Sequence, residues 1–173
     1  MIKDVRSFQE IRSKLIGDAI HVCFVQNRDP RVITDKPSLI LLKSTSLPMP
    51  RVCAFFPDNL EPALVKSIFE HVGRVPIATR GVAALKRMMV EHELKGEGVI
   101  DLQAAAMTHA KGRSEQTVCN WVWGCQWCPI ALAEWFTPPL DQDQSYDLAF
   151  YMDLTSAFIK KVGFSNLTVK KSN

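Results

Sequence analysis

Five short apolar runs, the first three separated only by loops, constrain the fold of this chain more than any other feature. The first three span residues 19–25, 38–42 and 51–56, and strands joined by loops alone commonly pair as antiparallel neighbours. The last two, at 75–79 and 98–101, are separated by helical patterns, which is typical of parallel strands joined by crossovers. The pattern predicts an α/β fold with a mixed five-stranded sheet, three strands antiparallel and then two parallel, flanked by helices.

Apolar residues at helical spacing predict five helices around these strands. Asp58 or Asn59 is expected to cap the first helix, which Gly73 ends, and Ser114 is expected to cap the fourth. Gly163 is expected to stop the last and longest helix. The expected spans are about 58–72, 82–92, 102 onward, 114 onward and 141–162, followed by a C-terminal tail at 164–173 whose end frays.

The length and composition favour one soluble domain. The 173 residues fit a single unit, 1–173, with its own core. There is no run of about 18 apolar residues that would favour a membrane span, and the first residues lack the apolar core of a signal peptide. We therefore expect a cytoplasmic protein without a membrane contact. A formal net charge of +3 permits nucleic-acid binding without arguing for it.

Several local sequences, in the same order along the chain, resemble those of DEDD 3′–5′ exonuclease domains. Residues 38–42, Ser-Leu-Ile-Leu-Leu, resemble the family's second strand, and residues 98–105 resemble its strand ending in aspartate with the alanine-bearing helix that follows. Residues 134–141 resemble the segment before the last helix, and residues 149–153 resemble a motif within it. The match runs from about 5 to 162 and implies a ribonuclease H-like fold.

The resemblance also implies a chemistry that this sequence lacks the residues to perform. The family's reaction needs four carboxylates converging on two divalent ions. Asp101 matches the third acidic position and Asp153 the fourth. The first, an aspartate–x–glutamate at the end of the first strand, has no counterpart in residues 23–27, and the second falls on Gly81 or Val82. We therefore predict a pseudoenzyme without a metal or other cofactor, in which the two aspartates are vestigial.

The five cysteines admit two interpretations. An odd number of cysteines in an intracellular protein favours reduced thiols over a disulfide framework. Cys119, Cys125 and Cys128 with His109 would be a candidate zinc site, but a structural zinc site usually draws on two paired-cysteine motifs and only one is present. Thiols on a helix face are the favoured interpretation.

Tryptophans concentrate in one segment. Trp121, Trp123, Trp127 and Trp135 fall within fifteen residues, and four indoles around one helix and its following turn do not easily all point inward. Because aromatic residues dominate binding hot spots, we predict a partner interface at Trp121, Trp123 and Trp127. A locally tryptophan-rich core and base stacking are the alternatives.

Basic residues surround the second predicted helix. Arg74, Arg80, Lys86 and Arg87 form either a solvated face or a surface that contacts phosphates beside the former active site. The second interpretation makes these four the candidate nucleic-acid-binding residues.

Together these features predict a catalytically inactive adaptor. The chain is similar to the inactive exonuclease domains of Egalitarian and Exuperantia type and to the exonuclease-domain adaptors of small-RNA silencing. This similarity implies a role in RNA metabolism, with small-RNA silencing as one setting, in the cytoplasm or perinuclear RNA granules. The expected partners are a protein or a second copy of this chain, and single-stranded RNA.

Two rival functions remain. One is a residual metal-dependent 3′–5′ exoribonuclease that recruits Asp29, Asp58 or Asp147 as substitute ligands. The other is a scaffold for proteins alone, which would not bind RNA even at low salt, where attraction to phosphates is strongest.

Overall fold

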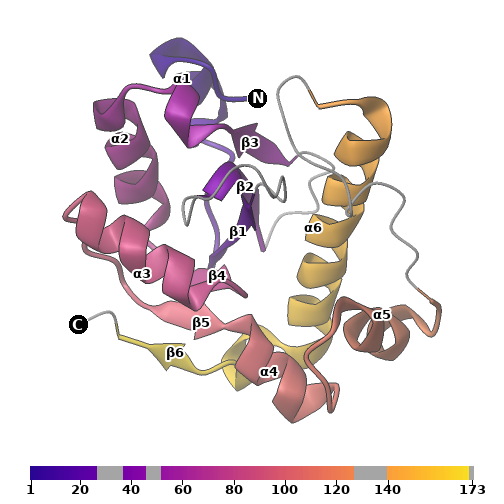
Figure 1. The fold of residues 1–173 in the computed structure, drawn as a ribbon. Helices are drawn as coiled ribbons and strands as arrows, with labels where there is room; N and C mark the ends of the chain where they lie inside the picture. Colours follow the sequence, from indigo (N-terminus) through magenta and orange to yellow (C-terminus); the bar gives the residue numbers. More distant parts are fainter. Residues whose placement is uncertain (27–36, 46–51, 127–139, 172–173) are drawn as a thin grey trace.

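A six-stranded mixed sheet forms the centre of the computed structural model, which describes residues 1–26, 37–45, 52–126 and 140–171 (Figure 1). The sheet order is β3-β2-β1-β4-β5-β6. Strands β1, β2 and β3 pair antiparallel, and β4 runs parallel to both β1 and β5, which confirms the predicted pairing. The strands are β1 (Ile20–Gln26), β2 (Pro37–Ser44), β3 (Cys53–Phe55), β4 (Ile77–Thr79), β5 (Val99–Asp101) and β6 (Val169–Lys170).

The sixth strand is the main difference from the predicted sheet. Val169 pairs with Ile100 and Lys170 with Val99, antiparallel to β5, so the prediction of a frayed end at residues 170–173 is wrong for Lys170. A two-residue strand with both side chains exposed carries no alternation that the sequence could reveal. The backbone at Gly98, just before β5, lies close to β6, because a Cβ on Gly98 would be 2.5 Å from Cγ1 of Val169.

Within the described residues, six α-helices accompany the sheet, one more than predicted. The unpredicted helix α1 is short and fully buries only Phe8, so its apolar stripe is too narrow to stand out; a capping box between Asp4 and Ser7 starts it. The helices are α1 (Val5–Arg12), α2 (Pro62–Val72), α3 (Val82–Glu91), α4 (Leu102–His109), α5 (Glu115–Trp123) and α6 (Gln142–Val162).

The helix caps agree with the sequence in part. Ser114 accepts a hydrogen bond from the Thr117 amide and caps α5 as predicted. The predicted cap of α2 is wrong, because Asp58 and Asn59 lie in a separate 3₁₀ turn and the N-cap residue is Glu61, with no side-chain capping bond. The proline at the first position of α2 starts the helix instead, since its φ angle is already helical.

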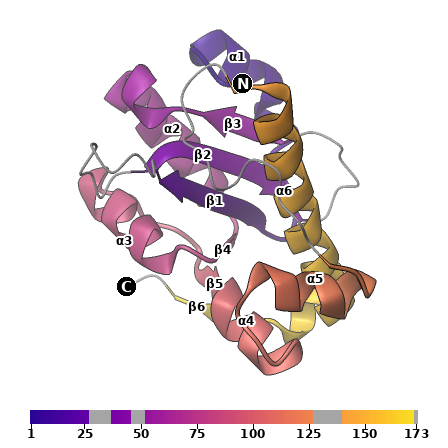
Figure 2. The ribbon, with the colours of Figure 1, turned by 45° about the vertical axis from the view of Figure 1, so that its right-hand side comes forward.

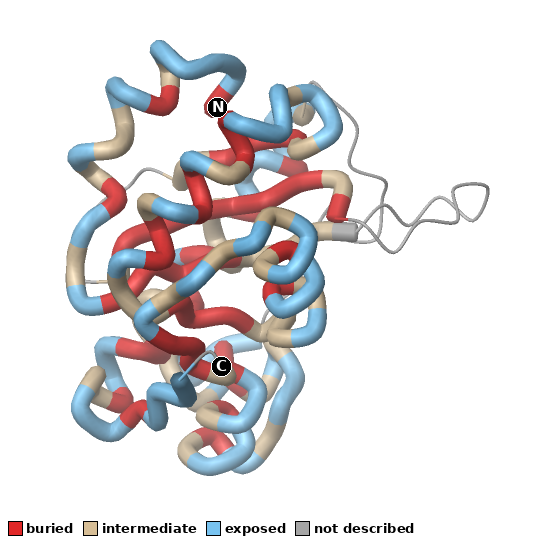
Figure 3. Tube along the Cα trace, turned by 90° about the vertical axis from the view of Figure 1, so that its left-hand side faces the viewer, coloured by how far each residue is buried: buried red, intermediate tan, exposed pale blue. Residues whose placement is uncertain are grey.

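Helices cover both faces of the sheet, as Figure 2 shows for α6 on one side and α2 on the other. Ile20, Val22, Ile40 and Leu42 pack with α1, α2 and α3, whereas Leu39 and Leu41 pack against α6. This two-residue alternation follows from strand geometry. The buried strands form the interior of the trace in Figure 3.

Two small 3₁₀ turns complete the described elements, at Pro57–Asn59 and Phe164–Asn166. Gly163 ends α6 with a φ of 83°, as the sequence predicts. Within the described part of the chain, no helix combines the length and the apolar character that crossing a membrane requires.

Candidate functional site

Polar side chains gather on the α6-facing side of the two central strands. His21 and Lys43 are directly paired between β1 and β2, and both are buried. Since Val22 and Leu42 point toward α2, the strand alternation directs His21, Cys23 and Lys43 toward α6. Helix α6 contributes Tyr151 and Asp153 to the same region. We call His21, Cys23, Lys43, Tyr151 and Asp153 the polar cluster.

An ion pair between β2 and α6 is the strongest charge interaction of the polar cluster. The Lys43 ammonium donates to Oδ1 of Asp153. The Lys43 side chain is 5% exposed and the Asp153 side chain 55% exposed. The lysine stem is therefore embedded between the sheet and α6, while the pair itself reaches the surface, where water solvates the carboxylate.

His21 is a neutral ring without a hydrogen-bond partner among the described residues. It is fully buried, and neither ring nitrogen has a bonding partner there. Burial, followed by the nearby charges of Lys43 and Arg80, lowers the pKa of His21 to about 3. Its ring centroid lies 6.1 Å from that of Tyr151. At neutral pH the ring therefore adds no charge to the polar cluster.

Cys23 and Tyr151 share a side-chain hydrogen bond. Burial raises the pKa of the Cys23 thiol to about 12, and burial, followed by the neighbouring Cys23, raises the pKa of Tyr151 well above its usual value. Both groups therefore keep their protons at neutral pH. A protonated thiol is neither a nucleophile nor a metal ligand.

Arg80 connects the end of β4 to α5. Its side chain is 14% exposed, and its Nη1 lies 3.2 Å from Oε1 of Glu115. Its Nη2 also donates to the carbonyl oxygen of Arg113. A guanidinium with two such contacts at its two terminal nitrogens holds the start of α5 against the sheet.

No protein-family model and no curated protein matches the sequence. Two structures of RNase D from Trypanosoma brucei are similar. The first has 16% identity and a TM-score of 0.65 over 91% of this chain and 62% of that chain. The second, in complex with RNA U12, has 17% identity and a TM-score of 0.62 over 92% and 60%.

The chain shares the fold of RNase D. A protein from Bifidobacterium adolescentis is also similar, with 15% identity and a TM-score of 0.68 over 94% of this chain and 40% of that one. The chain thus spans less than two-thirds of the length of each of these structures. The expected ribonuclease H-like fold of the DEDD exonucleases is confirmed, and at these identities the likeness concerns the fold.

The polar cluster does not fit a pair of divalent ions of the kind that the exonuclease fold implies. Strand β1 reads Ile-His-Val-Cys-Phe-Val-Gln and offers no carboxylate. The Asp153 carboxylate carries the Lys43 ammonium, and a cation there opposes the binding of another. Among the described residues, no three histidine, cysteine, aspartate or glutamate side chains form a group that could hold a metal ion.

Asp101, which matches the family's third acidic position, has a structural role here in starting helix α4. Its Oδ1 accepts hydrogen bonds from the amides of Gln103 at 3.0 Å and Ala104 at 3.1 Å. It is thus the N-cap of α4. Its neighbour Ile100 packs toward the α5–α6 side, and the strand alternation turns Asp101 the other way.

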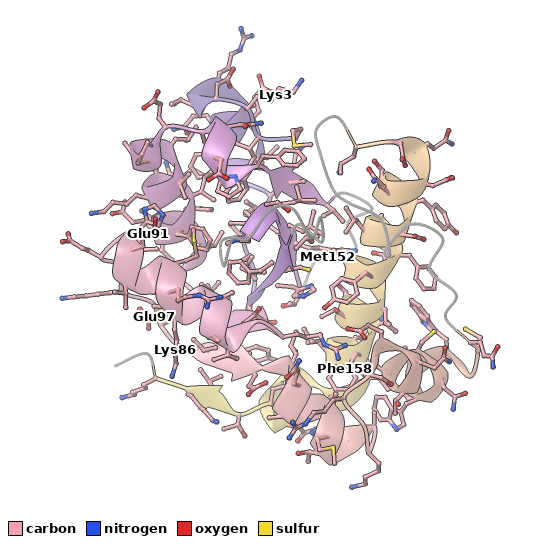
Figure 4. All side chains as sticks on the ribbon, viewed as in Figure 1. Lys3, Lys86, Glu91, Glu97, Met152 and Phe158 are labelled. Carbon is pink, nitrogen blue, oxygen red and sulfur yellow. The ribbon has the colours of Figure 1, made fainter. Side chains whose placement is uncertain are left out.

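The four predicted nucleic-acid-binding residues are spread over three segments. Arg74 follows α2 and precedes β4, whereas Arg80 follows β4. Lys86 and Arg87 are exposed on α3, as Figure 4 shows for Lys86. The Arg80 side chain is 14% exposed, whereas Arg74, Lys86 and Arg87 are exposed. Their contact with phosphate remains a prediction.

Of the predicted interface tryptophans, the structure describes two. Trp121 is half-buried, edge-on to Phe158 at 5.6 Å between ring centroids, and the Lys161 ammonium lies 4.6 Å from the Trp121 ring centroid. Trp123 is 41% exposed and lies 5.1 Å from Phe150, centroid to centroid. Trp127 and Trp135 lie outside the described residues, as does Cys128 of the candidate zinc site.

The sequence contains a signal for the polar cluster outside the motifs that resemble the exonuclease family. Lys43 follows four apolar residues in β2, and a charge that extends a buried strand needs a partner. The two-residue alternation places it on the same face as Leu39 and Leu41. Its partner Asp153 is 110 residues away, and only the packing of α6 brings it near.

We expect the two partners of the ion pair to differ in their effect on stability. Asp153→Ala leaves a buried ammonium without its acceptor and should lower the free energy of unfolding by about 1–3 kcal/mol. Lys43→Met keeps the apolar stem and leaves a carboxylate that water can solvate, so its cost should stay under about 1 kcal/mol. Urea unfolding measures both. Asp153→Asn, which keeps an acceptor oxygen, is the matched control, and equal losses for the first two variants would contradict the assignment.

The His21 ring should make the protein sensitive to acid. Its pKa is about 3 in the folded protein against an ordinary 6.5, so the unfolded chain binds the proton first as the pH falls. As the pH falls from 6.5 to about 3, His21 should therefore lower the free energy of unfolding by up to about 1.4 kcal/mol per pH unit. His21→Leu should remove that component. Urea unfolding of both proteins at several pH values tests this, and parallel pH profiles would contradict it.

Proposed function

We propose that this chain is a catalytically inactive exonuclease-like domain that acts as a protein-interaction and RNA-binding adaptor in RNA metabolism. The observation that carries the proposal is the ion pair between Lys43 and Asp153. In this pair the lysine of β2 neutralises the carboxylate that matches the family's fourth acidic position.

Electrostatics supports the loss of activity. Two divalent ions need a site with an excess of negative charge. In the polar cluster the single carboxylate is balanced by Lys43, His21 is neutral with a pKa of about 3, and Cys23 is a protonated thiol with a pKa of about 12. The positive charge of Arg80 acts to lower the pKa of both His21 and Cys23. Lys43 offsets the charge of Asp153, and Glu115 offsets that of Arg80, so the polar cluster has no excess of negative charge.

Exposed aromatic residues support the adaptor role. Tyr146 is 64% exposed on α6, and Phe150 lies one turn further along the same face. Phe150 contacts Trp123 of α5, which is itself 41% exposed. Tyr146, Phe150 and Trp123 together form what we call the aromatic surface. Aromatic residues of this kind bind partners at low cost in side-chain entropy.

The proposed RNA contact uses the exposed cations of α3. Lys86 and Arg87 project from α3, which begins directly after β4 and Arg80. An RNA backbone lying there would be attracted without a metal ion, since phosphate contacts need only positive charge and hydrogen-bond donors. The setting of small-RNA silencing, in the cytoplasm or perinuclear granules, is proposed from the resemblance to inactive exonuclease-domain adaptors.

The rival function as a residual exoribonuclease would need substitute ligands. Asp58 lies exposed in the 3₁₀ turn at Pro57–Asn59, and Asp147 is buried on α6, 3% exposed. Asp29 lies outside the described residues. We favour the adaptor because neither described aspartate belongs to a group of three potential metal ligands within the described residues.

A gel assay with 5′-labelled single-stranded RNA tests catalysis and binding together. We expect the RNA to stay intact over a time course in Mg²⁺ or Mn²⁺ and to appear as a retarded complex at low salt, where phosphate contacts are strongest. Degradation that disappears in Asp153→Asn would overturn the inactive assignment. A contaminating nuclease would degrade RNA equally in both preparations.

Charge reversal tests the RNA-contacting surface in the same assay. Lys86→Glu combined with Arg87→Glu should weaken the complex by about tenfold or more and reduce its salt dependence. Lys3→Glu is the matched control, because Lys3 lies beside α1, far from Lys86 (Figure 4). Equal weakening of the complex by the double variant and by Lys3→Glu would refute a localised contact. If the wild-type protein does not retard RNA at all, the function as a scaffold for proteins alone is favoured.

The aromatic surface should mediate self-association. We expect the wild-type protein to form a dimer as its concentration rises and Trp123→Ala with Tyr146→Ala to remain monomeric, because these rings lose solvent contact in the dimer. Sedimentation velocity measures this. Val90→Ala is the control, since Val90 is 80% exposed on α3. A wild-type monomer at all concentrations would contradict the homodimer.

A further inference from the structure

Two thiols are in contact at the C-terminal end of α5. The Sγ atoms of Cys119 and Cys125 are 3.7 Å apart. Cys119 is completely buried in the cluster that joins α4, α5 and the C-terminal half of α6. Cys125 is exposed. One thiol of the pair is therefore accessible to solvent, and the other lies directly beneath it.

The turn after α5 produces this contact. Gly124 ends the helix with a φ of +71°, in the left-handed region, and donates its amide hydrogen to the Asn120 carbonyl at 2.8 Å. This conformation reverses the chain so that Cys125 comes back over the last turns of α5. Nothing lies within 4 Å of a Cβ at position 124, so glycine is required there by the backbone angle rather than by space.

A lysine from α6 keeps the end of α5 in place. The Lys161 ammonium donates to the carbonyl oxygens of Trp121 at 2.5 Å and Val122 at 3.4 Å. It also lies over the Trp121 ring. These contacts satisfy carbonyl groups that the helix itself leaves without partners. The segment between the two thiols is thus anchored to α6.

The other described thiols lie in environments that suppress their reactivity. Burial raises the pKa of Cys23 to about 12 and also raises the pKa of Cys53. Thiols that keep their protons react slowly with oxidants and disulfides. Cys23 and Cys53 serve as internal references for the pair at α5.

We propose that Cys119 and Cys125 form a reversible intramolecular disulfide, which makes the end of α5 a redox-modification site. The co-reactant is a small-molecule disulfide such as oxidised glutathione. This inference does not depend on the proposed adaptor function, since it rests on the contact between the two thiols alone.

The reaction proceeds by two thiol–disulfide exchanges. The Cys125 thiol loses its proton to solvent, and its thiolate attacks one sulfur of the glutathione disulfide, breaking that bond and releasing one glutathione thiolate. The Cys119 thiol then loses its proton, and its thiolate attacks the Cys125 sulfur and releases the second glutathione. Two protein thiols are oxidised, and one glutathione disulfide is reduced to two thiols.

Exposure determines this order. Cys119 has no accessible surface, so a bulky disulfide reaches Cys125 first, and Cys119 acts as the resolving thiol. The closed bond would fix the turn at Gly124 and thereby the path of the chain as it leaves α5. Since Trp123 lies within the closed loop, oxidation would also restrict one ring of the aromatic surface.

Peptide mapping of the whole protein after incubation in glutathione buffers of rising oxidised fraction tests the proposal. We expect a linked peptide pair joining Cys119 to Cys125, a mass lower by two hydrogen atoms, and loss of iodoacetamide labelling at both residues, reversed by dithiothreitol. Cys23 and Cys53 should label after unfolding as before. A stable glutathione adduct on wild-type Cys125, or a bond from Cys125 to Cys128, would overturn the proposal.

Three variants separate the steps. Cys119→Ser should accumulate the glutathione adduct on Cys125, because the resolving thiol is missing. Cys125→Ser, a change at an exposed position that leaves the core intact, should leave Cys119 reduced, and oxidation of Cys119 in this variant would contradict the order. Gly124→Ala should slow closure by about fivefold, which corresponds to about 1 kcal/mol of strain at a left-handed residue; an unchanged rate would refute the role of the turn.

Discussion

The contact between Lys43 of β2 and Asp153 of α6 determines how the centre of this molecule is organised. A lysine that is almost fully buried in a central strand needs an anionic acceptor, and α6 provides one at the point where the helix crosses the strands. The rest of the polar cluster is compatible with that positive charge. His21 next to it remains neutral, and the pair of Cys23 and Tyr151 keeps both protons.

The polar cluster also shows that a fold and the charges of its site can change independently. The chain shares the fold of RNase D over 91% of its length, yet the charges of its polar cluster balance one another, whereas a site for two divalent ions needs an excess of negative charge. A fold of this kind can keep its packing while its site changes, because the core on either side depends on apolar residues such as Val22 and Met152. Figure 4 shows Met152 on α6 beside the sheet.

Much of the fold could be predicted from the sequence, but the site only in part. The apolar runs that became β1 and β2 are long, and the period of α6 is clear, so element type and pairing followed from local patterns. The capping role of Ser114 was also local. What failed depended on distant partners: β6 forms because β5 lies beside it, and the role of Lys43 depends on a residue 110 positions away. The N-cap at Asp101 is local as well, since its acceptor bonds reach only two and three residues along the chain, whereas the role of Asp153 as counter-charge appears only with the tertiary structure.

The two edges of the sheet determine which kind of assembly is open to this chain. Strand β3 has three residues and β6 two, and the amide of Ile2 donates to the Ala54 carbonyl at 2.7 Å, occupying part of the outer side of β3. So short an edge offers little backbone for a neighbouring chain to extend the sheet, which is how natural β proteins avoid uncontrolled stacking into aggregates. Contacts with other molecules are thereby left to the side chains of the surrounding helices, where specificity can be encoded residue by residue.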